Sequence, residues 1–154
     1  MNPRLRRLQA DYDHVAAAFT HHPHIRLLGA EGSPPEKYVF EFQLDGLVPE
    51  ADDSFAPGSV HRAEIFLPID YPRRPPFCRM ITPVFHPNID PQKICIGDHW
   101  SAGQSLAQLI VRIGEMICYQ SYNVKSPLNA TAAAWAEQNA DKLPLVKTDL
   151  SGGV

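Results

Sequence analysis

Paired cysteines are missing from this sequence. Its three cysteines, Cys78, Cys95 and Cys118, form no CxxC motif and have no spacing typical of a zinc site. An odd number of cysteines without a recognisable signal peptide argues against a secreted disulfide scaffold. A thiol oxidoreductase is a weak hypothesis, because no resolving cysteine lies nearby in the sequence. We therefore expect a reducing, cytoplasmic location.

Long apolar runs and an excess of positive charge are also missing. No stretch approaches the roughly 20 apolar residues of a membrane-spanning helix. The formal net charge of −3 gives no support to nucleic acid as the main partner. The cluster of His21, His22 and His24 supplies too few ligands for a metal site and fits a solvated turn. We expect no membrane, nucleic-acid or metal binding.

Proline is abundant, and its positions indicate long ordered connections. Many of the 15 prolines lie between segments with regular hydrophobic patterns, where they fix the backbone of loops. The 154 residues are enough for one domain with a real hydrophobic core. We expect a single domain over residues 1–146 and a flexible tail over residues 147–154.

Apolar residues recur at helical spacing in two segments. Residues 4–19 form the first predicted helix, with Arg7 and Asp11 among its surface residues. The second predicted helix runs from Ser105, a plausible N-cap, to about Cys118. A third, alanine-rich helix is predicted to open at Pro127 and to stop before Pro144.

Alternating patterns predict four short strands between the first two helices. They cover residues 25–28, 38–44, 60–67 and 77–80, and their succession suggests an antiparallel meander. Residues 45–59 are predicted to be a flexible excursion rich in turn residues. Residues 81–103 have no regular period and are predicted to form a long active-site loop. The order of elements predicts an α+β domain.

The long loop holds a cysteine close to a His-Pro-Asn tripeptide. Cys95 follows Asn88 by seven residues, and the side chains of His86 and Asn88 can hydrogen-bond a group attached to sulfur. The structural alternatives stay open: most free cysteines are small buried apolar residues, and His and Asn often satisfy backbone groups in proline turns. Cys78 and Cys118 fit that structural interpretation better, because they fall in a predicted strand and helix.

Five short motifs resemble, in the same order, those of the E2 ubiquitin-conjugating enzymes over roughly residues 4–143. They are the proline loop Tyr71–Pro76, the tripeptide His86–Asn88, the cysteine segment Ile94–Ile96, the pair Trp100-Ser101 and the segment Ser126–Asn129. The resemblance implies the UBC fold: an N-terminal helix, a four-stranded antiparallel meander, a long active-site loop and two or more C-terminal helices.

The resemblance also implies an acyltransferase in which Cys95 carries a ubiquitin-like modifier as a thioester. An E1-like activating enzyme would supply the modifier and use the ATP, so this chain needs no cofactor; a target protein amine or a ligase would receive it. Asn88 would stabilise the oxyanion or hold the loop that does so, and His86 would brace that loop. Ser126 stands where many members have an acidic residue that orients the attacking amine, and a serine can hydrogen-bond an amine but carries no charge. Asp98 and His99 are alternatives for that role.

By the same resemblance, seven residues are expected to contact partners. They are Arg4, Arg6 and Arg7 on the first helix, where E2 enzymes meet the activating enzyme, and Arg73, Arg74, Trp100 and Ser101 around the proline loop. A solvated basic face is the alternative for the three helix arginines. Arg73 replaces the apolar residue that many members use to dock RING ligases, which puts the ordinary ligase contact in doubt.

Several departures from the family indicate a divergent member. The Cys95 loop is one residue shorter than usual, Ala102-Gly103 replaces Pro-Ala, and little sequence is left for the last helix. Such departures resemble bacterial E2-like proteins of modifier-conjugation operons, many of them linked to phage defence. The second hypothesis is a non-catalytic E2-variant module that binds a modifier or ligase. Such variants typically lack the cysteine that this chain keeps.

Overall fold

An antiparallel sheet of four strands forms the centre of the computed structural model, which describes residues 2–96 and 100–154. The strands lie side by side in chain order: β1 (Ile25–Gly32), β2 (Pro35–Pro49), β3 (Phe55–Phe66) and β4 (Phe77–Met80). The α-helices of the described residues are α1 (Pro3–Phe19), α2 (Leu106–Ile117) and α3 (Ala130–Gln138). The predicted α+β class, the antiparallel meander and the later helices are confirmed.

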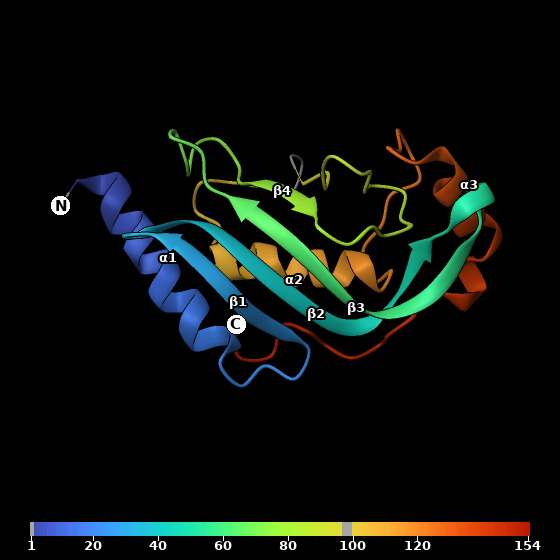
Figure 1. Cartoon of the computed structure of the whole chain (residues 1–154), viewed down its shortest axis with the longest axis horizontal. Coiled ribbons are helices and arrows are strands. Elements are labelled where there is room, and N and C mark those ends of the chain that lie inside the picture. Colours follow the sequence, from blue (N-terminus) through green and yellow to red (C-terminus); the bar gives the residue numbers. More distant parts are fainter. Residues whose placement is uncertain (1, 97–99) are drawn as a thin grey trace.

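Helices α1 and α2 cover one face of the sheet, and α3 lies beyond its far end (Figure 1). Helix α1 begins at Pro3, because the side chain of Asn2 accepts a hydrogen bond from the Leu5 amide at 2.8 Å. Helix α2 begins after Ser105, whose side chain forms a capping box with Gln108. Among the described residues, no helix has both the length and the apolar character needed to cross a membrane.

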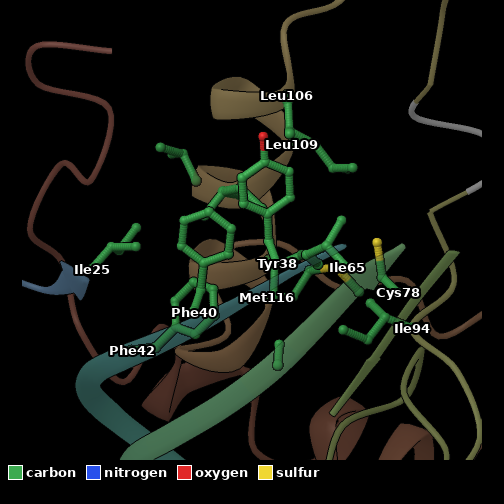
Figure 2. Packing of buried hydrophobic residues seen from close by; sticks show 14 of the residues in the cluster. Ile25, Tyr38, Phe40, Phe42, Ile65, Cys78, Ile94, Leu106, Leu109 and Met116 are labelled. Carbon is green, nitrogen blue, oxygen red and sulfur yellow. The ribbon is translucent and has the colours of Figure 1, made fainter. Parts of the chain in front are cut away.

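The core lies between this helix layer and the inner face of the sheet. Strand β2 alternates as predicted, so that Tyr38, Phe40 and Phe42 all point inward and are fully buried. Figure 2 shows the Tyr38 ring beside Leu109 of α2, with Phe40 and Phe42 following in the same cluster. Because helix and sheet residues interleave here, the inner face of β2 fixes the position of α2.

The predicted flexible excursion over residues 45–59 is wrong. Strands β2 and β3 stay paired as far as Pro49 opposite Phe55, with one irregularity between Gln43 and Gly46. At that irregularity the buried His61 ring donates its Nε2 hydrogen toward the carbonyls of Leu44 (3.2 Å) and Gly58 (3.0 Å). The glycine, proline and aspartate residues of this segment thus build a strand bulge and a tight hairpin end, which resemble loop signals in sequence.

The long hairpin of β2 and β3 reaches a second hydrophobic cluster around α3. At its end Phe55 stacks on Phe85 with ring centroids 4.6 Å apart, and both rings contact Trp135 of α3. Helix α3 begins at Ala130, later than the predicted opening at Pro127, because the Asn129 side chain accepts the Ala132 amide and caps it there. The second cluster therefore joins α3 to the hairpin and to the start of the long loop.

The segment 147–154, expected to be a flexible tail, is packed on the domain in the structure. Leu150 is 0% exposed and lies against Gly114 and Phe42. Its carbonyl is 2.8 Å from Nε2 of His22, and the Gln120 side chain donates to the carbonyls of Val146 and Thr148. Two apolar residues among polar neighbours do not stand out in the sequence, yet Leu150 and Val154 both pack against the main core and help to anchor the segment.

Replacing Leu150 with alanine should lower the free energy of unfolding by about 2 kcal/mol, as measured in urea. This is below the cost of a deep cavity, because the segment is able to detach from the core instead of leaving a void. Gly152→Ala is the control, because a Cβ there meets nothing within 4 Å. Equal stabilities of the Leu150→Ala variant and the wild type would contradict the docked segment.

Candidate active site at Cys95

Cys95 is presented to solvent by two buried neighbours. Ile94 and Ile96 are each 4% exposed and belong to the main core, whereas the Cys95 side chain between them is exposed. The Ile94 amide donates to the carbonyl of Cys78 at 2.8 Å, and the Cys95 amide donates to the carbonyl of Asn88 at 2.9 Å. The alternation of anchored and outward side chains fixes the thiol at the surface.

The other two cysteines are structural. Both Cys78 and Cys118 are buried, and burial raises the pKa of both thiols, that of Cys118 to about 11. A thiol that stays protonated is a poor nucleophile, because the thiolate is the reactive form. The structural interpretation thus holds for Cys78 and Cys118, and the exposure of Cys95 favours the functional one.

His86 lies fully buried with both ring nitrogens occupied. Its Nδ1 accepts a hydrogen bond from the Asn88 amide at 2.9 Å, and its Nε2 donates to the carbonyl of Ser121 at 3.0 Å. Burial lowers the pKa of His86 to about 4, so the ring is neutral at neutral pH. This geometry supports a bracing role and leaves no ring nitrogen for proton transfer.

The Asn88 side chain bonds the backbone on the opposite side of the site. Its Nδ2 donates to the carbonyl of Asn123 at 2.9 Å, and its Oδ1 accepts the Asn123 amide at 2.8 Å. The carbonyl of Pro87 accepts the amides of Leu128 and Asn129. The His86–Asn88 turn is therefore fastened to segment 121–129, and one Nδ2 hydrogen of Asn88 makes no bond within the described residues.

A cavity of about 410 Å³ opens between Cys95 and segment 121–126. Its lining consists of Asn88, Cys95, Met116, Ser121, Tyr122, Asn123, Lys125 and Ser126. Ser126, the expected amine-orienting residue, does line this cavity, with a left-handed backbone (φ 51°). No carboxylate stands among these lining residues, and Asp98 and His99 fall outside the described part of the chain.

Trp100 connects the end of the Cys95 loop to the proline loop. Its Nε1 donates to the carbonyl of Pro72 at 2.8 Å, and its ring lies 5.6 Å from that of buried Tyr71. Ser101, next to it, is exposed. Trp100 is thus half-buried and engaged internally, so Ser101 is the more accessible of this pair.

Arg7 departs from the partner-contact prediction. It donates to the carboxylate of Asp11 and, at 2.6 Å each, to the carbonyls of Ala102 and Gln104. Asp11, predicted to be a surface residue, is 4% exposed and also accepts a hydrogen bond from the Tyr71 hydroxyl. The pair instead fixes α1 to the segment after Trp100, because a buried carboxylate requires such partners.

The remaining arginines predicted to contact partners differ in exposure and in how many hydrogen bonds they make within the chain. Arg4 donates to the backbone carbonyls of Pro68 and Ile69, so much of its hydrogen-bonding capacity is used internally. Arg6 and Arg73 are exposed, and Arg74 is exposed with an ion pair to Asp70. Arg6 and Arg73 are accordingly the best placed of the five arginines to meet another protein.

Two positioning residues were missed in the sequence. Asn123 receives the Asn88 side chain through its backbone alone, so its residue type gives no signal. Tyr119 has a left-handed backbone (φ 63°), donates from its hydroxyl to the carbonyl of Phe85, and places its ring 4.8 Å from His86. In the sequence, Tyr119 is recognisable only as a tyrosine just after a predicted helix. That pattern is too common to predict a positioning role.

Comparisons with known proteins show which family the chain resembles. The family model described as "Ubiquitin-conjugating enzyme" matches residues 33–144. "Ubiquitin-conjugating enzyme E2 N" of Drosophila melanogaster is 32% identical over 120 residues, covering 75% of this chain and 77% of that protein. "SUMO-conjugating enzyme UBC9" of Caenorhabditis elegans is 27% identical over 97 residues, which cover 59% of this chain and 57% of that protein.

Comparison with solved structures finds a similar fold. The crystal structure described as a ubiquitin-conjugating enzyme from Plasmodium yoelii superposes with a TM-score of 0.64 at 21% identity, covering 92% of this chain and 88% of that one. At this identity the structural match establishes the fold, and the sequence matches establish the family. This chain therefore belongs to the ubiquitin-conjugating enzyme family and has its UBC fold.

Proposed function

We propose that Cys95 accepts a ubiquitin-like modifier as a thioester from an E1-like activating enzyme and passes it to an acceptor. The observation that carries the proposal is the exposed Cys95 thiol at a cavity whose opposite side is fastened through Asn88. Cys78 and Cys118 are buried, so Cys95 is the accessible nucleophile. Ubiquitin-conjugating transferase activity in general follows from the family; the thioester on this residue is the proposal.

The chemistry requires little of the protein beyond an accessible, positioned thiol. The Cys95 thiolate attacks the acyl carbon of the modifier thioester on the activating enzyme, and the sulfur of that enzyme leaves with its bonding electrons. A thioester keeps the acyl group activated, because thiolate remains a good leaving group. Asn88 is proposed to hold the loop and to direct its second amide hydrogen to the oxyanion.

A surface beside the proline loop is proposed to receive the partner enzymes. Ile69 is 82% exposed, and exposed Arg73 belongs to the same shallow hollow as the start of α1. An apolar residue with nearby arginines fits an acidic, partly apolar partner surface. We assign the activating enzyme and any ligase to this surface, with Arg6 and Arg73 as the charged contacts.

Cys95→Ser should abolish the reductant-sensitive adduct that forms with ubiquitin, a ubiquitin-activating enzyme and ATP. Cys95→Lys should give a reductant-stable adduct, because an amide replaces the thioester. Non-reducing and reducing gels with intact mass analysis check both results, and Cys118→Ser is the matched control that keeps the adduct. A reductant-sensitive adduct on Cys95→Ser would remove Cys95 from the proposal. If ubiquitin gives none with the wild type, the modifier and activating enzyme from neighbouring genes are used.

The alternative function is a non-catalytic module that binds a modifier or ligase. The exposed Cys95 speaks against it, because a binding module has no need of an accessible thiol. Titration of ubiquitin without activating enzyme or ATP separates the two. Micromolar binding together with no thioester on addition of both would favour the module.

The biological setting is a further part of the proposal. We place the chain in the cytoplasm, in a bacterial modifier-conjugation system that acts in phage defence. Its support is the set of departures around Cys95 and Ala102-Gly103. Neighbouring genes for an activating enzyme, a ubiquitin-like protein and a deconjugating protease are the expected observation, and their absence would contradict this setting.

A further inference from the structure

Lys93 and Cys95 leave the backbone on the same side. Along residues 93–96 the side chains alternate: Lys93 and Cys95 are exposed, whereas Ile94 and Ile96 are each 4% exposed and belong to the main core. This alternation is that of an extended segment, in which every second side chain points to the same face. The lysine side chain and the thiol therefore start from one face of the segment, two residues apart.

A tight turn fixes the backbone that carries Lys93. Oδ1 of Asp90 accepts the amides of Gln92 and Lys93 at 2.8 Å each, and the Asp90 amide donates to the carbonyl of Lys93 at 3.0 Å. Ile89 and Ile94, on the two sides of this turn, form an antiparallel bridge. Because aspartate caps the turn in this way, the Lys93 backbone has a fixed position before the cysteine.

A lysine at this position reaches an acyl group on the Cys95 sulfur. Side chains two residues apart on an extended segment start about 7 Å from each other. The flexible four-carbon stem of lysine spans most of that gap. Because only two residues of backbone join the amine to the thioester, the amine is held near the acyl carbon at a high effective concentration.

The other lysines of the chain lack this short connection to the thiol. They are Lys37 in β2, Lys125 in the cavity lining, and Lys142 and Lys147 after α3. Each of them must approach the thioester from a distant segment of the chain, whereas Lys93 belongs to the same segment as the thiol. Transfer that depends on the short connection should therefore reach Lys93 alone.

We propose that Lys93 is a self-modification site, which takes the acyl group of the Cys95 thioester as an amide when no other acceptor is present. This inference rests on the proposed function, since it needs that thioester. The chain then discharges its own cysteine and keeps the acyl group, because an amide does not exchange with thiols. Lys93 thereby limits the lifetime of the charged chain.

The transfer needs no reactant beyond water. The Lys93 ammonium gives a proton to water, and the neutral Nζ bonds to the acyl carbon while the carbonyl electron pair moves to oxygen. The tetrahedral intermediate then collapses, and the bond to the Cys95 sulfur breaks with both electrons on that sulfur. The nitrogen loses its second proton and the thiolate takes one up, which gives an amide on Lys93 and a free Cys95 thiol.

The test uses the full chain and a chemical donor, so that no activating enzyme is needed. Cys95 is acylated by exchange with the mercaptoethanesulfonate thioester of acetyl-Gly-Gly, the excess donor is removed, and the acyl group is followed over time. A thiol reductant removes a thioester and spares an amide, so intact mass before and after reduction measures both species. Peptide mapping identifies the lysine that carries the amide, and Cys95→Ser is the blank for direct acylation.

We expect an amide on Lys93 that forms at the same rate when the protein is diluted about tenfold, because donor and acceptor share one chain. Lys93→Arg, which keeps the charge, should form the amide about tenfold more slowly and lengthen the lifetime of the thioester. Lys142→Arg is the matched control, an exposed lysine after α3 that should change neither rate. An excess of N-acetylcysteinamide should take the acyl group before it reaches Lys93.

Moving the lysine by one residue tests the geometry. Gln92→Lys combined with Lys93→Arg keeps a lysine in the same turn but places it one position out of the alternation with Cys95. The amide should therefore stay as slow as in Lys93→Arg alone. A wild-type rate in this double variant would overturn the inference, because nearness in sequence would then be sufficient.

An amide that maps to Lys125, or one that forms equally fast in Lys93→Arg, would overturn the inference. A rate that rises in proportion to protein concentration, or a thioester that is lost by hydrolysis alone, would do the same. Failure of the proposed function has a different signature: no thioester forms with a modifier, an activating enzyme and ATP, although the chemically installed acyl group still moves from Cys95 to Lys93.

Discussion

The free energy of unfolding should fall by about 3 kcal/mol between pH 7 and pH 4 because of His86 alone, given its folded-state pKa of about 4. The unfolded chain binds the imidazole proton near the ordinary pKa of 6.5, whereas the folded protein does so only near 4. Between these values the unfolded state holds more protons, so acid favours it. The contribution is complete above pH 6.5 and is lost progressively as the pH approaches 4.

The cause of this acid sensitivity is the bonding of the ring. Nδ1 accepts the Asn88 amide, so a proton placed there would confront a hydrogen-bond donor inside an apolar site. Burial of His61 also lowers its pKa, and this group adds to the pH dependence in the same direction.

Urea unfolding at a series of pH values measures how steeply the free energy of unfolding falls with pH, and this slope is compared between variants. His86→Gln should be less stable at pH 7 and should lose stability less steeply toward pH 4. Leu150→Ala is the control for destabilisation as such, because it removes no titrating group and should keep the wild-type slope. A His86→Gln variant with the full wild-type slope would contradict the burial of a neutral His86.

Replacing Asn88 with alanine should slow acyl transfer from Cys95 about 100-fold, the second large effect that we expect. The variant loses both side-chain bonds to Asn123 and the second amide hydrogen proposed for the oxyanion. The amide and the carbonyl of Asn123 lose these partners at the same time, so thermal stability should fall as well.

Single-turnover discharge of the Cys95 acyl protein measures this rate at saturating acceptor. Asn139→Ala is the matched asparagine control: it removes one side-chain bond, to the carbonyl of Trp135, at the end of α3. It should cost about 1 kcal/mol of stability and leave the discharge rate unchanged. An Asn88→Ala rate within threefold of wild type would remove Asn88 from the chemistry and leave it a structural residue.

The elements that sequence predicted well are those whose evidence is local. Helix α2 was recognisable from its apolar spacing and from Ser105, because a capping box and a helical stripe need only neighbours in sequence. Cys95 and the His86–Asn88 turn were recognisable by resemblance. Their expected closeness is observed as the bond from the Cys95 amide to the Asn88 carbonyl.

Contacts between segments that are distant in the sequence could not be predicted from the sequence. Arg7 looked like a surface cation. Besides the nearby Asp11, it bonds the carbonyls of Ala102 and Gln104, which lie about 95 residues away and are backbone groups of no particular type. The paired hairpin beyond Gly46 was hidden for the same reason, since ladder bonds leave no mark on residue type. Such contacts are decided by tertiary packing, which outweighs local propensity.

The two hydrophobic clusters have a consequence for how this site can change over evolution. The flanks of Cys95 belong to the main core, whereas Tyr119 and the neighbours of the opposite wall belong to the cluster around α3. The His86–Asn88 turn lies between the two clusters and is connected to segment 121–129 by hydrogen bonds. Substitutions around Trp135 can therefore alter the width of the cavity, and with it the acceptors it admits, without any change at the cavity surface or in the main core.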